Sequence, residues 1–169
     1  MKKLLFAFLF AQACAVNAQQ LFSSMVEQNN KQLSGYVFVS LAMPDSHLIG
    51  IARDAYRSGM TIVLNGYMDG YPRNKDETQK RVLEINRACC GERGGAHWMI
   101  NPPLYDRYKI SNVPAFVIAK GASSSPMDYS KVSGEMSIPI ALRFFYQNSQ
   151  IPEVKTKSHE IYQRFANNQ

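Results

Sequence analysis

One stretch, residues 36–59 (YVFVSLAMPDSHLIGIARDAYRSG), restricts the possible folds of this chain more than any other. Residues 36–41 are rich in aromatic and β-branched side chains with little alternation, which predicts a strand covered on both faces of a sheet. A turn over residues 43–45 follows, and Gly59 ends a predicted helix. The apolar residues of that helix recur at the spacing of one helical face: Leu48, Ile51, Ala52 and Ala55.

A second apolar segment, residues 60–64, begins directly after Gly59 and predicts another strand. Strand, helix and strand in such short order predict a right-handed parallel crossover. The carboxyl ends of parallel strands lie at one edge of a sheet. We therefore expect the turn over residues 43–45 and the loop after residue 64, which is dense in turn residues, to share that edge.

Residues 1–18 have the pattern of a secretory signal peptide. Two lysines precede an apolar core from Leu4 to Ala11, and small residues lead to a predicted cleavage site before Gln19. The apolar core is too short for a stable membrane anchor, so no stable membrane insertion is expected after signal cleavage. The remaining chain is long enough for one domain with a sizeable core.

Charge and motifs exclude several classes of function. Removal of Lys2 and Lys3 leaves 17 basic and 13 acidic residues, scattered without an aromatic-interleaved run, so a nucleic-acid interface is not predicted. His47, His97 and His159 lie on separate predicted elements, which disfavours a metal site. The sequence has neither a Gly-rich phosphate loop after a strand nor a Gly-x-Ser-x-Gly motif. No cofactor is predicted.

The two cysteines that remain after export, Cys89 and Cys90, are adjacent. Neighbouring Cα atoms are about 3.8 Å apart, whereas an unstrained disulfide needs about 4.4–6.8 Å, so a vicinal disulfide is not expected as a structural cross-link. Helical spacing places Cys89 on one stripe with Val82 and Ile85, where a thiol acts as a small hydrophobe. Cys90 lies about 100° around the helix, and a redox or intermolecular role for it stays open.

The rest of the chain predicts further elements, among them a helix over residues 74–90 that begins with an Asn74–Glu77 capping box. The predicted helix over residues 138–147 turns Ile140, Ala141, Phe144 and Phe145 inward. The segment 149–169 is a polar tail, which is either disordered or docked on a partner. The other predicted elements are helices over 19–32 and 102–108, strands over 115–119 and 127–133, and a short strand or extended link over 97–101.

In this order the elements resemble thioredoxin. The resemblance rests on the turn over residues 42–45, on the segment 101–114 (NPPLYDRYKISNVP), which is similar to the passage into the thioredoxin cis-proline, and on the strand, strand, helix ending. It implies an α/β, thioredoxin-like fold over residues 36–148, with a central mixed sheet flanked by helices and a helical insertion before Pro114. An N-terminal helical segment, 19–35, precedes this domain.

The departure from thioredoxin lies at its reactive site. Aligning Pro44 with the proline of the Cys-Gly-Pro-Cys motif puts Ala42 and Asp45 where the two cysteines would be. Disulfide exchange needs a thiolate, which neither residue supplies. Redox chemistry at the turn is therefore not expected, and catalytic residues are not predicted there.

The segments FVSLAMPDSHLIGIARDAYRSGMTIVLNGYMDG and YKISNVPAFVI resemble the TrbC family of F-type conjugative transfer systems, over roughly residues 36–140. The resemblance implies a periplasmic factor of a type IV secretion system in a Gram-negative host. It also implies a role in building the conjugative pilus, with a TraW-like partner and other secretion-system components. The alternative is a periplasmic thiol-disulfide oxidoreductase or isomerase that uses Cys90 with Cys89.

A thioredoxin scaffold without thiols can still bind an extended segment by strand addition beside the cis-proline position. The predicted partner-binding surface comprises Met43, Pro44, Asp45, Tyr67, Met68, Asp69, Asn112, Val113 and Pro114. The alternative is purely structural: Pro44 and Asp45 begin a helix, where an acidic side chain suits the helix dipole, and Pro114 only shapes the chain.

Overall fold

The computed structural model describes residues 33–68, 74–92, 94–121 and 123–167. The predicted signal peptide, the predicted helix over residues 19–32 and Asp69 lie outside the described residues. The elements, in chain order, are β1 (Leu33–Val39), α2 (Asp45–Ser58), β2 (Thr61–Leu64), α3 (Lys75–Cys90), β3 (His97–Ile100), α4 (Pro102–Arg107), β4 (Ala115–Lys120), β5 (Tyr129–Ser133), α5 (Ile138–Asn148) and α6 (Pro152–Asn167).

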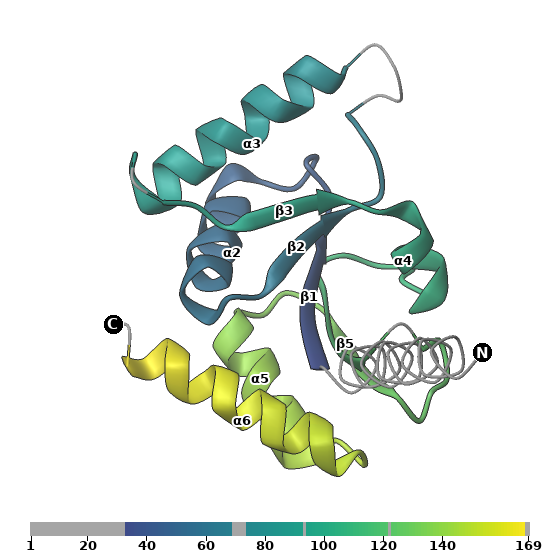
Figure 1. Cartoon of the computed structure of the whole chain (residues 1–169). Helices are drawn as coiled ribbons and strands as arrows, with labels where there is room; N and C mark the ends of the chain where they lie inside the picture. Colours follow the sequence, from purple (N-terminus) through teal and green to yellow (C-terminus); the bar gives the residue numbers. More distant parts are fainter. Residues whose placement is uncertain (1–32, 69–73, 93, 122, 168–169) are drawn as a thin grey trace, which may run out of the picture. The chain divides into compact units, whose positions relative to one another are not determined.

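A five-stranded mixed sheet in the order β3-β2-β1-β4-β5 forms the centre of the fold (Figure 1). Strand β1 is parallel to β2, which is parallel to β3, while β4 is antiparallel to both β1 and β5. The predicted parallel crossover and the interior position of the first strand are thus confirmed. The mixed α/β architecture is consistent with the thioredoxin-like fold expected from the sequence, with α3, β3 and α4 inserted between β2 and Pro114.

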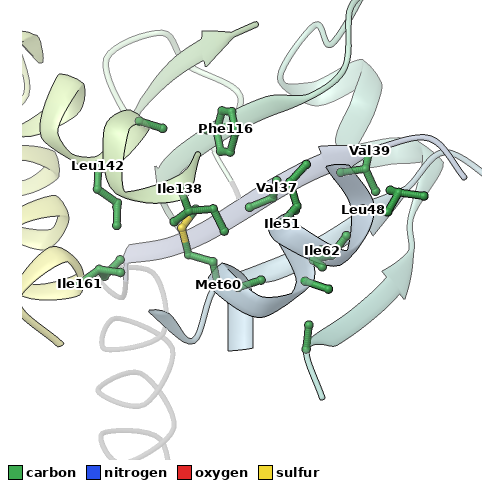
Figure 2. Close-up of a cluster of buried hydrophobic side chains, with 14 of the residues drawn as sticks. Val37, Val39, Leu48, Ile51, Met60, Ile62, Phe116, Ile138, Leu142 and Ile161 are labelled. Carbon is green, nitrogen blue, oxygen red and sulfur yellow. The ribbon is translucent and has the colours of Figure 1, made fainter. Parts of the chain in front are cut away.

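Two hydrophobic cores cover the two faces of this sheet. On one face Val37 and Ile62 pack with residues of α2, α5 and α6 (Figure 2), and Ile85 of α3 belongs to the same cluster. On the other face Phe38 and Val117 pack against Leu104, Tyr105 and Tyr108 at α4. Because β1 and β4 are buried on both sides, their sequences are apolar without alternation.

Strand β1 begins earlier than predicted, at Leu33 rather than at Tyr36. Leu33, Ser34 and Gly35 pair with Lys120, Ala119 and Ile118 of β4. The assignment of residues 33–35 to an N-terminal helical segment was therefore wrong, because the ladder with β4 extends the strand.

The end of α2 agrees with the prediction. Gly59 has the left-handed conformation (φ 73°), and its amide donates to the Ala55 carbonyl at 2.8 Å. Glycine adopts this conformation without steric cost. The chain can therefore turn sharply from α2 into β2.

The capping box predicted for α3 does not form. Asn74 makes no side-chain cap, and its carbonyl instead accepts hydrogen bonds from the Thr78 amide at 2.9 Å and from Thr78 Oγ1 at 2.7 Å. The buried Thr78 hydroxyl also accepts a hydrogen bond from the Met68 amide. Thr78 thus stabilises both the first turn of α3 and the loop before it.

Helix α5 is rotated from the predicted orientation. Ala141 and Phe145 are buried as predicted, but Ile140 and Phe144 are exposed, and Ile138 and Leu142 take their place in the core. The reason is that α5 packs against α6 and α2, which turns its buried stripe toward these helices.

The segment predicted to be a polar tail forms α6, which packs on α5 and α2. Val154, Ile161 and Phe165 are buried, and so is Ser158, whose hydroxyl donates to the Val154 carbonyl at 2.7 Å. The apolar stripe is narrow and contains a serine, which explains why its polar composition predicted a tail. Residues 149–167 are an integral part of the fold.

Candidate functional site

The structure brings the turn before α2 next to the Val113–Pro114 peptide bond, which is cis. Two cavities connect them, and each is lined by residues from both segments. The predicted proximity of the turn and the proline segment is therefore present. The predicted surface is divided between the two cavities.

The first cavity, which we call the turn groove, has a volume of about 490 Å³. It lies at the carboxyl ends of β1 and β2, on the side of the sheet where α4 lies. Its lining includes Ala42 from the turn, Tyr67 and Met68 from the loop after β2, Tyr105 from α4, and Val113.

The second cavity, the helix groove, has a volume of about 500 Å³ and lies between α2 and the start of α5. Met43 and Pro114 connect it to the turn. Its other walls come from α2 and from the chain before and within α5, including His47, Ile51, Met136 and Ile140. Thioether and aliphatic side chains line this groove together with polar and charged ones, among them Arg53, Asp54 and Glu135.

The remaining predicted site residues lie around these grooves. Pro44, Asp45 and Asn112 are exposed, whereas Pro114 is buried and contributes to a wall rather than to an open surface. Asn112 Nδ2 donates to Ser111 Oγ at 3.4 Å. Pro44 is the N-cap of α2, and Asp45 is its first residue.

Asp45 forms an ion pair with Arg81 of α3, which sequence reasoning did not identify. The guanidinium makes two contacts with the carboxylate, Nη2 with Oδ1 and Nη1 with Oδ2. The hydrogen bond to Asp45 raises the pKa of Arg81. The pair joins the start of α2 to α3, and 36 positions of sequence separate the two residues.

Tyr105 is a second residue that the sequence did not reveal. Its hydroxyl reaches the Val39 carbonyl at 2.8 Å and the Val63 carbonyl at 3.0 Å, so that it joins β1 and β2 at the floor of the turn groove. Burial raises the pKa of Tyr105 to about 12. A neutral phenol is thus held between the two strand ends that carry the turn and the loop.

The chemical groups at the turn suit binding rather than disulfide exchange. Ala42 is exposed and Asp45 is engaged with Arg81 at the positions where thioredoxin has its cysteines. Within the part of the chain that the structure describes, no three His, Cys, Asp or Glu side chains gather where they could hold a metal ion.

A family model for the type-F conjugative transfer system pilin assembly protein, TrbC, matches residues 37–145. The chain belongs to the TrbC family. The matched region contains the turn, the cis-proline and the residues of both grooves named above, while α6 lies beyond it. A search of curated proteins and a search of solved structures found no match.

Membership of the TrbC family gives the chain a role in F-type conjugative pilus assembly. In the described residues, every helix is either too short or too polar to cross a membrane. The resemblance noted in the sequence, from residue 36 to about residue 140, coincides closely with the region that the family model matches.

In this TrbC-family chain the two cysteines form a vicinal disulfide, Cys89–Cys90, which contradicts the prediction from their spacing. Their Cα atoms are 3.8 Å apart. The prediction treated this separation as decisive, but both residues lie in the last turn of α3, where the chain leaves the helix at Gly91 (φ 75°). The apolar packing predicted for Cys89 is present, since this residue contacts the core on the α2 side of the sheet.

Proposed function

We propose that this chain is a non-catalytic periplasmic assembly factor of an F-type conjugative type IV secretion system. It acts through protein contacts at the surface formed by the turn, the loop after β2 and the Val113–Pro114 segment. The observation that carries the proposal is the pair of grooves on either side of the cis-proline, at a turn where alanine and an ion-paired aspartate replace the nucleophiles of thioredoxin.

The occupant that fits this surface is an extended segment of a partner protein. Among the described residues, no hydrogen bond to the backbone N–H or C=O of Val113 is present, so these groups can pair with an added strand. Alternate side chains of an extended segment point in opposite directions. The turn groove on the α4 side and the helix groove on the α2 side can each accept one set of them.

The proposed partner is a TraW-like periplasmic protein, together with other components of the secretion system. The family role in pilus assembly and the signal-peptide pattern of residues 1–18 support this proposal. The signal-peptide pattern supports export, and the family role in an F-type conjugative transfer system supports the periplasm of a Gram-negative bacterium as the location.

The binding surface is tested by Asp45→Lys in a pull-down of the TraW-like partner from periplasmic extract. We expect at least a tenfold loss of recovered partner, because the substitution reverses the charge beside both grooves. The free energy of unfolding should fall by at most about 1 kcal/mol, the range for an exposed ion pair or a helix cap.

Arg81→Gln is the matched control, since it breaks the same ion pair but leaves the carboxylate of Asp45 in place. It should leave partner recovery unchanged. Equal recovery with Asp45→Lys and with the unmodified protein would remove this surface from consideration.

The absence of catalysis is tested by replacing both Cys89 and Cys90 with serine. Pilus formation and DNA transfer should persist, because the proposed role uses the grooves and not the sulfur atoms. Loss of transfer by a variant that remains folded would contradict the non-catalytic role. It would instead support the oxidoreductase alternative, which the family match does not support.

A further inference from the structure

The Cys89–Cys90 disulfide lines a cavity of its own, away from the two grooves. This sulfur cavity has a volume of about 610 Å³ and is formed by the end of α3 and one side of α2. The two cysteines contribute one wall, and Arg53, Tyr56 and Arg57 contribute the other. The sulfur pair is thus next to open space and is only partly buried.

The charge of the sulfur cavity is positive. None of its described lining residues is acidic, and two of the five are arginines. Asp54 lies between these arginines in sequence and lines the helix groove, as Arg53 also does. Burial raises the pKa of its carboxyl group, while its electrostatic interactions with Arg57 and Arg53 oppose this shift. The lining of the sulfur cavity thus carries two positive charges, which one neighbouring carboxylate partly offsets.

The second arginine is held in place by α6. The guanidinium carbon of Arg57 lies 5.7 Å from the centroid of the Phe165 ring, a cation–π distance. Phe165 is buried in the contact between α6 and α2. The contact with α6 therefore positions the Arg57 side chain beside the sulfur cavity.

Close packing also surrounds Tyr56. A Cβ atom added to Gly94 would lie 2.6 Å from the Tyr56 hydroxyl oxygen, so the backbone at Gly94 passes tightly over this side chain. Tyr56 is nevertheless 52% exposed. Its remaining surface can contact a small molecule in the sulfur cavity.

We propose that the sulfur cavity is a reaction site for small anionic thiols, in which Arg53 and Arg57 attract a carboxylate-bearing thiolate to the Cys89–Cys90 disulfide. Positive side chains beside a cavity raise the local concentration of anions and the rate of their encounter. A thiolate is itself an anion, and a carboxylate on the same molecule adds to the attraction. The arginines attract the ligand and the disulfide reacts with it. Neither step uses the turn groove or the helix groove.

The reaction proceeds in two exchange steps. The incoming thiolate attacks one sulfur of the pair, the Cys89–Cys90 bond breaks, and the bonding electrons leave with the other cysteine as a thiolate. A second thiolate attacks the outer sulfur of the mixed disulfide and releases a symmetrical small disulfide. Overall, two small thiolates are oxidised to one disulfide, and the protein disulfide is reduced by two electrons to two cysteine thiolates. Each cysteine thiolate becomes neutral when it takes a proton from solvent.

The test compares 3-mercaptopropionate with cysteamine at low ionic strength. These are the anionic and the cationic thiol, each supplied in excess to the purified protein. Aliquots are quenched with N-ethylmaleimide, and the mass of the protein reports alkylation of Cys89 and Cys90. After correction for thiolate concentration and for the rate at which each thiolate reduces an uncharged small disulfide, we expect 3-mercaptopropionate to reduce the protein disulfide about three to ten times faster, and 0.5 M NaCl to remove most of this preference.

The Arg53→Gln/Arg57→Gln variant should lose the preference, while the control Arg143→Gln, an exposed arginine on α5, should keep it. Since Arg57 also contacts Phe165, the single variant Arg53→Gln tests the charge effect without disturbing α6, and it should lower the preference by about half on a logarithmic scale. Equal rates for the two thiols, an unchanged preference in Arg53→Gln, or free thiols in the protein before any treatment would each overturn the proposal.

Discussion

Helix α2 connects two regions of opposite character. At its first residue lie the turn, two grooves and the cis-proline, without sulfur nucleophiles. Along its second half lie two arginines and, across the sulfur cavity, the cysteine pair. Thioredoxin combines the groove and the sulfur atoms at one place, and here they are separate. Groove geometry and thiol chemistry are therefore independent properties of this scaffold.

The two regions are also stabilised by different interactions. The turn region depends on polar contacts: the Tyr105 hydroxyl between two strand ends, Thr78 with the Met68 amide, and Asp45 with Arg81. The disulfide region depends on the packing of α6 on α2 and on the cation–π contact between Phe165 and Arg57. Substitutions can therefore weaken one region without altering the other.

The largest expected effect is on the packing of α6. Ile161→Ala should lower the free energy of unfolding by about 2–5 kcal/mol, because it leaves a cavity at a side chain that is 4% exposed. Urea denaturation measures this loss. The neighbouring Glu160→Ala, on the exposed side of α6, should change stability by no more than about 0.5 kcal/mol. Equal effects of the two substitutions would contradict the integral role of α6.

The next effect concerns the turn region. Tyr105→Phe removes the hydroxyl that the Val39 and Val63 carbonyls share, and an unsatisfied buried acceptor costs about 1–3 kcal/mol. The variant should therefore unfold at lower urea concentration and bind the partner more weakly. Tyr146→Phe, at a tyrosine that is 46% exposed, is the control and should behave like the unmodified protein. A fully stable Tyr105→Phe would show that this hydroxyl does not support the groove.

The same tyrosine predicts a loss of stability in alkali. Its pKa is about 12 in the folded protein, against about 10 when unfolded, so the folded state retains the phenol proton in this interval. The free energy of unfolding therefore falls as the pH rises from about 10 to 12. At pH 11 the loss due to Tyr105, relative to neutral pH, is about 1.4 kcal/mol. Comparing urea unfolding at pH 8 and pH 11 measures it. Tyr105→Phe should show a correspondingly smaller loss, and an identical pH dependence would refute the assignment.

The smallest expected effect is that of the Asp45–Arg81 ion pair. Because Asp45 is 61% exposed, the coupling energy from a double-mutant cycle with Asp45→Asn and Arg81→Gln should be about 0.2–1 kcal/mol, and it should decrease in 1 M NaCl. A coupling energy well above this range would show that the ion pair stabilises the conformation of the turn. Weaker partner binding by an Asp45 variant could then result from an altered turn.

Local patterns predicted most of the fold. The uninterrupted apolar run of β1, the helical spacing of α2 and Gly59 were sufficient for the parallel crossover, because each depends on residues close together in the chain. The proximity of the turn and the Val113–Pro114 segment followed from the thioredoxin resemblance. The division of the predicted site into two grooves did not, since it depends on how α4 and α5 lie against opposite faces of the sheet.

The errors share a physical cause. The rotation of α5 and the folding of residues 152–167 into α6 arise from the contact between these two helices. This contact cannot be recognised in the sequence of either helix by itself. Likewise, Arg81 and Tyr105 have no local signal that marks them, because their partners lie on other elements. The vicinal disulfide was wrongly excluded because the Cα separation alone was taken to decide it.

The sequence by itself determined the sheet, the family and the absence of cysteines at the turn, since these depend on composition, spacing and motifs within short stretches. Only the tertiary structure decided that α6 belongs to the core, that two grooves flank the cis-proline, and that the sulfur pair lies beside two arginines. The reason is that these features depend on side chains from distant positions, whose distances and charges become defined only when the chain is packed.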